Sequence, residues 1–280
     1  MKRIITTLLS LAVVLIVPAS VSAAPIRIKS PETPLGIDIS YPQCDAKVPT
    51  NHAFGIVGVN DGLATIPNPC LAKQLLWAAK AIGGANQDKV QLYVNTANPG
   101  GMGTPSWPQD NMDPADNVVI DPYGACYGND SYACAWQYGW NRAHDDVNKW
   151  FPPAAQQAKI DQDPKVYRWW LDVELENTWK TGKTEFDQKS NVAVLEGMAA
   201  YFANQNIRTG IYSTGYQWGE ITGGRIDDSS NLVGLPNWRP GGMSLSTAKQ
   251  ACEAAPLTKG GVVVLAQYIS RGLDYNYSCI

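Results

Sequence analysis

The stretch "RWWLDVELENTW" (168–179) places acidic residues inside an apolar and aromatic run. Its centre puts Asp172 and Glu174 two residues apart, and in a β-strand such residues point to the same face of the sheet. Burying a carboxylate is unfavourable unless hydrogen bonds or a partner compensate for the lost hydration. The pair therefore predicts a strand that ends at a polar site, with Val173 turned to the other face.

Runs typical of strands alternate with runs typical of helices along the chain. Apolar residues recur at helical spacing in 70–82 and 191–206. This alternation is typical of a mostly parallel α/β sheet, and no G-x-G-x-x-G turn supports a dinucleotide-binding fold. Roughly eight strands fit a barrel, so we predict an α/β TIM-like (β/α) barrel, regular or incomplete. The strand-like runs are 36–40, 54–60, 90–96, 166–174, 209–214, 231–238, 261–269 and 272–276.

The segment 99–165 interrupts this alternation. It begins with "PGGMGTPSWPQDNMDP" (99–114), whose Gly, Pro and Asn content is typical of loops. We expect a loop-rich insertion with one helix over 137–151 that ends at Pro152. The predicted organisation is a leader at 24–35 followed by a single barrel domain at 36–280.

The N-terminal residues 1–23 resemble a secretory signal peptide. Lys2 and Arg3 precede an apolar run, and small residues end the segment at Ala23. No other apolar run is long enough to span a bilayer, so we expect a secreted, extracellular protein that is free of the membrane after cleavage. The formal net charge of −3 becomes −5 when Lys2 and Arg3 are removed. An acidic chain without clusters of cations is a poor nucleic-acid binder, and we expect a monomer.

Six cysteines remain in a chain that we expect to be exported. An even number in that compartment predicts disulfides, and the absence of C-x-x-C gives a zinc site little support. Fifteen pairings are open to six cysteines. We favour pairing between neighbours in sequence: Cys44 with Cys70, Cys126 with Cys134, and Cys252 with Cys279.

Two further acids sit where strands are expected to end. Asp38 follows the first strand-like run and Asp274 lies in the last, so a closed barrel would bring both toward Asp172 and Glu174. Clustered, buried carboxylates raise one another's pKa, which lets one act as a general acid while another stays ionised. Glycoside hydrolysis needs such a set, and aromatic side chains supply stacking faces for sugars. The nearby aromatic residues are Tyr41, Trp169, Trp170, Trp179, Tyr212, Trp218, Trp238 and Tyr268.

Other chemistries have less support. The chain has two histidines, His52 and His144, and no zinc-binding histidine motif. Ser213 lies in "GIYSTG" (210–215), which lacks the nucleophile-elbow pattern. The motifs of the chain therefore give no support for a metal or a cofactor. A structural role for each acid, as a cap of the following turn, and a Ca²⁺ site both remain open.

Four short motifs resemble those of family 25 glycoside hydrolases, the muramidase-type lysozymes. They are "GIDIS" (36–40), "WLDVE" (170–174), "GIYST" (210–214) and "AQYISRGLDYN" (266–276). They occur in the family's order and span most of the chain. The sequence departs from the family at "LYVNT" (92–96), where an aromatic–His–aromatic run is usual, and at Ala266, where Trp is usual.

The resemblance implies a barrel that cleaves the glycan of peptidoglycan without a cofactor. It implies that Glu174 is the general acid and that Asp172 orients the substrate's N-acetyl group or stabilises charge. Asp38 and Asp274 then resemble the acids that line the pocket. The aromatic residues taken to bind substrate are Tyr212, Tyr268 and Trp238. The departures from the family's pattern are compatible with a divergent, glycoside-hydrolase-like branch of the superfamily. The alternative function is a non-catalytic carbohydrate-binding or cell-wall-associated protein on the same scaffold.

Overall fold

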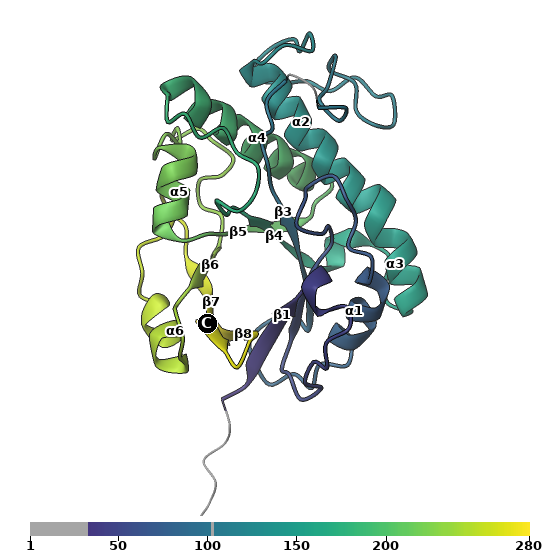
Figure 1. Ribbon diagram of the computed structural model, residues 1–280, viewed down its shortest axis with the longest axis vertical. Helices are drawn as coiled ribbons and strands as arrows, with labels where there is room; N and C mark the ends of the chain where they lie inside the picture. Colours follow the sequence, from purple (N-terminus) through teal and green to yellow (C-terminus); the bar gives the residue numbers. More distant parts are fainter. Residues whose placement is uncertain (1–32, 102–103) are drawn as a thin grey trace, which may run out of the picture. The chain divides into compact units, whose positions relative to one another are not determined.

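The computed structural model describes residues 33–101 and 104–280 of the 280-residue chain. Eight strands form a closed barrel in which each strand pairs with the next in sequence and β8 pairs with β1 (Figure 1). The predicted barrel is confirmed, in an irregular form. The strands are β1 (Leu35–Ile39), β2 (Gly55–Gly58), β3 (Val90–Asn95), β4 (Arg168–Asp172), β5 (Arg208–Tyr212), β6 (Asn237–Pro240), β7 (Val263–Ser270) and β8 (Leu273–Ser278).

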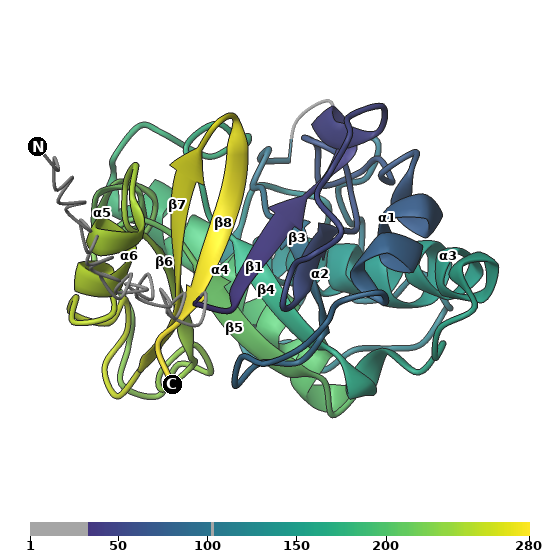
Figure 2. The same ribbon diagram turned by 90° about the horizontal axis from the view of Figure 1, so that it is seen from below.

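The last strand makes the barrel irregular. Strands β1 to β7 are parallel, whereas β8 is antiparallel to both β7 and β1 and lies between them (Figure 2). Only Arg271 and Gly272 separate β7 from β8, and their φ angles of 54° and 73° suit a two-residue hairpin turn. A parallel strand would need a far longer crossover. The beginning of β8 therefore lies at the same end of the barrel as the C-terminal end of β1.

Helices surround the strand ring (Figure 1). Between β1 and β2 the described chain has a short 3₁₀ turn, η1 (Tyr41–Gln43), in place of an α-helix. The other parallel connections each carry helix, as the right-handed β–α–β pattern requires. The helices are α1 (Leu71–Ala78), α2 (Tyr132–His144), α3 (Phe151–Ala158), α4 (Glu185–Asn204), α5 (Gly215–Thr222) and α6 (Leu245–Ala251).

The expectation that Pro152 ends a helix is wrong. Helical backbone runs from Tyr132 to Ala158, with the π-helical turn η2 (Asp145–Trp150) between α2 and α3. Pro152 lies in the first turn of α3, directly after the π-helical turn, and the helix continues through it. The segment 99–165 thus contains the regular helical crossover from β3 to β4, and its irregular part ends before α2.

Side chains that point into the barrel form a core separate from the one under the helices. Trp170, Trp238 and Leu265 pack together inside with Ile56 and Tyr212. Trp170 also donates its Nε1–H to Gln91 Oε1 at 2.8 Å. Gly210 makes room for this indole, since a Cβ there would lie 2.3 Å from the Trp170 ring. The next inward position on β4 after Trp170 is Asp172, so the aromatic core forms the floor of whatever Asp172 faces.

The three expected disulfides are confirmed: Cys44–Cys70, Cys126–Cys134 and Cys252–Cys279. The sixth strand lies later than expected, because 231–234 form turns and the strand begins at Asn237. The predicted signal peptide and most of the predicted leader lie outside the described residues. Among the helices in the described ranges, none combines the length and apolar character needed to cross a bilayer.

Candidate active site

A cavity of about 250 Å³ opens at the end of the barrel where β1 and β4 finish and β8 begins. An adjoining cavity of about 300 Å³ shares Asp38, Tyr93, Asp172, Glu174 and Asp274 with it and extends to the η1 turn and Glu176. We call the two together the acid pocket. The lining of the first cavity consists of Asp38, Tyr93, Asp172, Glu174, Tyr212, Trp238, Gln267, Ile269 and Asp274.

Asp38 is held by two amide side chains that sequence reasoning missed. Gln267 Nε2 donates to both carboxylate oxygens at 3.2 Å, and Asn276 Nδ2 donates to Oδ2 at 2.6 Å. Tyr212 donates its hydroxyl to Gln267 Oε1 at 2.8 Å, which fixes the orientation of that amide. Burial, followed by the charge of Asp274, raises the pKa of Asp38 well above its usual range, and the two amides oppose the rise.

Asp172 is the most isolated of the acids. Its carboxylate is buried, and Oδ1 has no hydrogen-bond partner among the described residues. Its backbone carbonyl, by contrast, accepts from the Thr96 hydroxyl at 2.7 Å, which ties the end of β4 to the end of β3. Burial, then the charges of Glu174 and Asp38, raises the pKa of Asp172 well above its usual range.

Glu174 lies two residues beyond the end of β4, in the loop that leads to α4. The backbone there is fixed from both sides: Trp179 Nε1 donates to the Glu174 carbonyl at 2.9 Å, and Leu175 N donates to Gln217 Oε1 at 2.8 Å. Burial and the charge of Glu176 raise the pKa of Glu174, whose side chain is only partly buried. Glu174 is therefore closer to solvent than Asp172.

Asp274 completes the acidic set from the opposite wall. It pairs with Asp38 in the antiparallel register of β1 and β8, and burial raises its pKa. The four acids come from three strands and the loop after β4, rather than from one metal-binding loop. In the ranges 33–101 and 104–280, no three His, Cys, Asp or Glu side chains are arranged to hold a metal ion.

Aromatic side chains form the rest of the wall. The rings of Tyr212 and Trp238 lie 4.4 Å apart, and Tyr93, which was not anticipated, meets Trp238 edge to face at 6.3 Å. The expectation that Tyr268 lines the cleft is wrong. Gln267 and Ile269 face the acid pocket, so the residue between them points outward, where Tyr268 stacks on Tyr275 at 5.5 Å.

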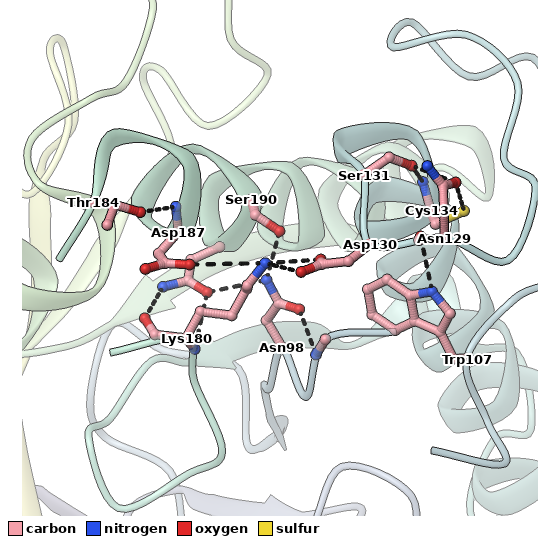
Figure 3. A network of polar contacts seen from close by, with 12 residues as sticks. Asn98, Trp107, Asn129, Asp130, Ser131, Cys134, Lys180, Thr184, Asp187 and Ser190 are labelled. Atoms are coloured by element: carbon pink, nitrogen blue, oxygen red, sulfur yellow. Dashed lines mark hydrogen bonds and ion pairs between the residues drawn. The ribbon is translucent and has the colours of Figure 1, made fainter. Parts of the chain in front are cut away.

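The loop that carries Glu174 is anchored by a polar network centred on Lys180 (Figure 3). Its ammonium group donates to Asp130 Oδ1 and Oδ2 at 2.7 and 2.6 Å and lies 3.8 Å from Asp187. Asn191 on α4 accepts from Lys180 N at 3.3 Å and from Asn98 Nδ2 at 3.0 Å. The network joins the segments that follow β3 and β4 to α4, so it limits the motion of Glu174 relative to the barrel.

The fold and the pocket define an α/β barrel with carboxylates gathered at the strand ends. A family model described as "Lysozyme-like protein 1" matches residues 144–248, less than half of the chain but including Asp172, Glu174, Tyr212 and Trp238. A search of curated protein sequences finds no match.

Solved structures share the architecture at low sequence identity. The spore cortex lytic enzyme SleM of Clostridium perfringens matches with a TM-score of 0.52 at 12% identity, over 89% of this chain and 68% of that one. A family GH25 lysozyme from Aspergillus fumigatus matches with a TM-score of 0.49 at 15% identity, over 86% and 91%. The modular Cpl-1 endolysin, in complex with a peptidoglycan analogue, matches with a TM-score of 0.45 at 15% identity, over 87% of this chain and 53% of that one, so this chain spans about half of it. The family match over 144–248 agrees with the lysozyme-like resemblance that the motifs indicate, and the match to SleM shows a shared barrel fold.

Proposed function

We propose that this protein is a secreted glycoside hydrolase that cleaves an N-acetylated cell-wall glycan of the peptidoglycan type. The observation that carries the proposal is the convergence of Asp38, Asp172, Glu174 and Asp274 on one cavity walled by aromatic rings. Hydrolysis of a glycosidic bond needs one carboxyl group as proton donor and a second group that stabilises the developing positive charge. Three disulfides support an extracellular place of action, since such bonds persist in oxidising compartments.

Glu174 is the proposed general acid. It is the acid of the set whose side chain combines partial burial with a loop position facing both parts of the acid pocket. Its raised pKa keeps a larger fraction protonated near neutral pH, so that it can donate to the leaving oxygen.

Asp172 is the proposed partner of the substrate's N-acetyl group. Its buried Oδ1 lacks a donor within the described chain, and an amide N–H of the substrate would supply one. Burial raises the pKa of Asp172, whereas the proposed role needs its ionised form. A hydrogen bond from the substrate's N–H favours the ionised form of Asp172 and so lowers its pKa.

The placement of both acids on one strand and its extension favours participation by the substrate. Asp172 ends β4 and Glu174 follows it by two residues, so both carboxylates reach the acid pocket from the same wall of the barrel. A covalent pair must flank the scissile bond instead. We infer that the N-acetyl oxygen attacks the anomeric carbon as Glu174 protonates the leaving oxygen, and that water, deprotonated by Glu174, then opens the cyclic intermediate.

The residues that line the acid pocket also bear on the substrate. None of its lining residues, all taken from the described chain, is Lys, Arg or His. A carboxylated sugar ring would meet only like charge beside the acids, so neutral N-acetylated rings fit better.

The test is digestion of peptidoglycan and of N-acetylated oligosaccharides, with products identified by mass spectrometry. The wild type should release fragments with new reducing ends, and Glu174→Gln should release essentially none. Binding of these glycans by the wild type without any cleavage would replace the proposal with the non-catalytic carbohydrate-binding protein.

A further inference from the structure

A larger hollow lies away from the acid pocket, between α2 and α4. Its volume is about 850 Å³, within the range of small-molecule binding sites. The segment 113–120 forms one lip, and we call this hollow the helix groove. Its lining comprises Asp113, Ala115, Asn117, Val118, Val119, Ile120, Trp136, Trp140, His144, Asn148, Ala200, Tyr201, Asn204 and Gln205.

The groove follows from the way the two helices cross. Gly139 and Gly197 let the backbones touch, since a Cβ on either would lie 2.0 Å from a carbonyl oxygen of the other helix. On α2 and η2 the groove residues recur at every fourth position, which places them in one row along the helix. That row is Trp136, Trp140, His144 and Asn148.

The floor of the groove combines aromatic rings with hydrogen-bonding atoms that have no partner. The Trp140 ring lies 5.3 Å from Trp136, stacked, and 5.1 Å from Tyr201, edge to face. Trp140 Nε1 and His144 Nδ1 are buried without a hydrogen-bond partner in the part of the chain that the structure describes. Buried polar atoms are rarely left unpaired, so these two point to a ligand that both accepts and donates.

The rim and the charge of the groove narrow the choice of ligand. Four amide side chains line it: Asn117, Asn148, Asn204 and Gln205. The ionisable groups are Asp113, Tyr201 and His144, and burial lowers the pKa of His144, which keeps its imidazole neutral. Asp113 is engaged by the backbone N–H groups of Ala115 and Asn117, each at 2.9 Å. With no Lys or Arg among its lining residues, the groove offers no permanent positive charge to pair with a phosphate or carboxylate.

We propose that the helix groove is a second carbohydrate-binding site, which takes neutral N-acetylated sugar rings of a polysaccharide. A sugar hydroxyl can accept from Trp140 Nε1 and donate to His144 Nδ1, whereas an apolar peptide side chain can do neither. The C–H faces of a pyranose pack against the Trp140 edge and the exposed Val118 and Ile120 of the lip. The site does not require the acid pocket to be catalytic. Its effect is to keep a long chain attached between encounters with that pocket.

The test uses Glu174→Gln protein, which prevents turnover, and sedimentation with chitin as the neutral N-acetylated probe and with insoluble peptidoglycan as the cell-wall polymer. Trp140→Phe keeps a six-membered aromatic ring but removes the indole N–H together with the five-membered ring, so we expect binding to fall about tenfold. Trp77→Phe is the matched control, because that indole lies on α1 and already donates to Pro49 O at 2.8 Å. Glu174→Gln protein that also carries Trp77→Phe should bind both polymers as tightly as Glu174→Gln protein alone. If Trp140→Phe does not fold, as judged by near-ultraviolet circular dichroism, the exposed rim variant Asn204→Ala should show a smaller loss of binding, about threefold.

Three outcomes would overturn the proposal. One is unchanged binding of both polymers by Trp140→Phe and Asn204→Ala. Another is an equal loss in Trp77→Phe. The third is a dimer of the Glu174→Gln protein that becomes a monomer when Trp140→Phe is added, as measured by analytical ultracentrifugation. That result would assign the groove to contact between copies of the chain. If the wild type fails to cleave any glycan while Trp140→Phe still weakens polymer binding, the proposed catalysis fails and the second site stands.

Discussion

Asp38 on β1 lies directly opposite Asp274 on β8, paired across the seam that closes the barrel. A parallel eighth strand would have carried its early residues to the far end of the barrel, away from the acid pocket. The two-residue turn at Arg271 and Gly272 reverses the strand and so brings Asp274 beside Asp38. The hairpin is therefore part of how this chain assembles its site.

The buried, incompletely bonded carboxylate of Asp172 should destabilise the native state. Its pKa is raised above the ordinary value of 3.8, so the folded protein binds more protons than the unfolded one above that pH. Stability should then fall as the pH rises from about 4 through the raised pKa. We expect Asp172→Asn to unfold in urea with a free energy about 1–3 kcal/mol higher than wild type at pH 7, and with no difference at about pH 3. Equal stability at both pH values would contradict this.

Glu176 should tune the pH range of activity. Its negative charge raises the pKa of Glu174, so Glu176→Gln should lower that pKa. A general acid with a lower pKa loses its proton earlier, and the alkaline limb of kcat/KM should move to lower pH. Because Glu176 is exposed, the shift should shrink as the Debye length falls from about 30 Å at 0.01 M to about 3 Å at 1 M salt. A shift toward higher pH would refute the electrostatic argument.

Gln267 joins Tyr212 to Asp38, and removing its amide should weaken the barrel. Gln267→Met keeps the length of the side chain but leaves the Tyr212 hydroxyl unpaired and Asp38 with fewer donors. We expect a loss of about 1–3 kcal/mol in the free energy of unfolding. Gln250→Met, at an exposed position of α6, is the control and should be neutral. If Gln267→Met unfolds with the same free energy as the wild type, the hydrogen bonds that link Tyr212, Gln267 and Asp38 contribute nothing to stability.

The disulfides should differ in their contribution to stability. Cys252–Cys279 closes 27 residues and Cys126–Cys134 closes 8. The loop-entropy relation gives about 3.5 kcal/mol for the first and about 2.5 kcal/mol for the second. Replacing each pair by serine and measuring urea unfolding should show this order, and the reverse order would mean that native contacts outweigh loop entropy.

Much of the barrel could be predicted because strand runs and amphipathic helices leave strong periodic patterns. The two-residue spacing of Asp172 and Glu174 likewise places both at one pocket. Tyr268 could not be placed, because a resemblance in the motif does not fix which residues of β7 point inward. The start of β6 was predicted too early, because residues 231–234 form turns and an apolar run alone does not distinguish a strand from a turn.

The proline after α2 was misleading for a different reason. A proline can end a helix or occupy the first turn of one, and the sequence alone does not distinguish the two cases. In the structure, Pro152 follows the π-helical turn η2 and lies in the first turn of α3. Gln267 and Asn276 were missed because amides carry no catalytic signature by themselves. Their position on the inward face of the last strands is what could have identified them.

The most direct test of the central claim is the turnover of Glu174→Gln on a glycan that the wild type cleaves, measured together with its Kd for that glycan. The account predicts that kcat falls by about 10²–10⁴-fold, since the isosteric amide cannot supply the proton, while Kd stays unchanged. Turnover near that of the wild type would contradict the assignment of Glu174 as the general acid.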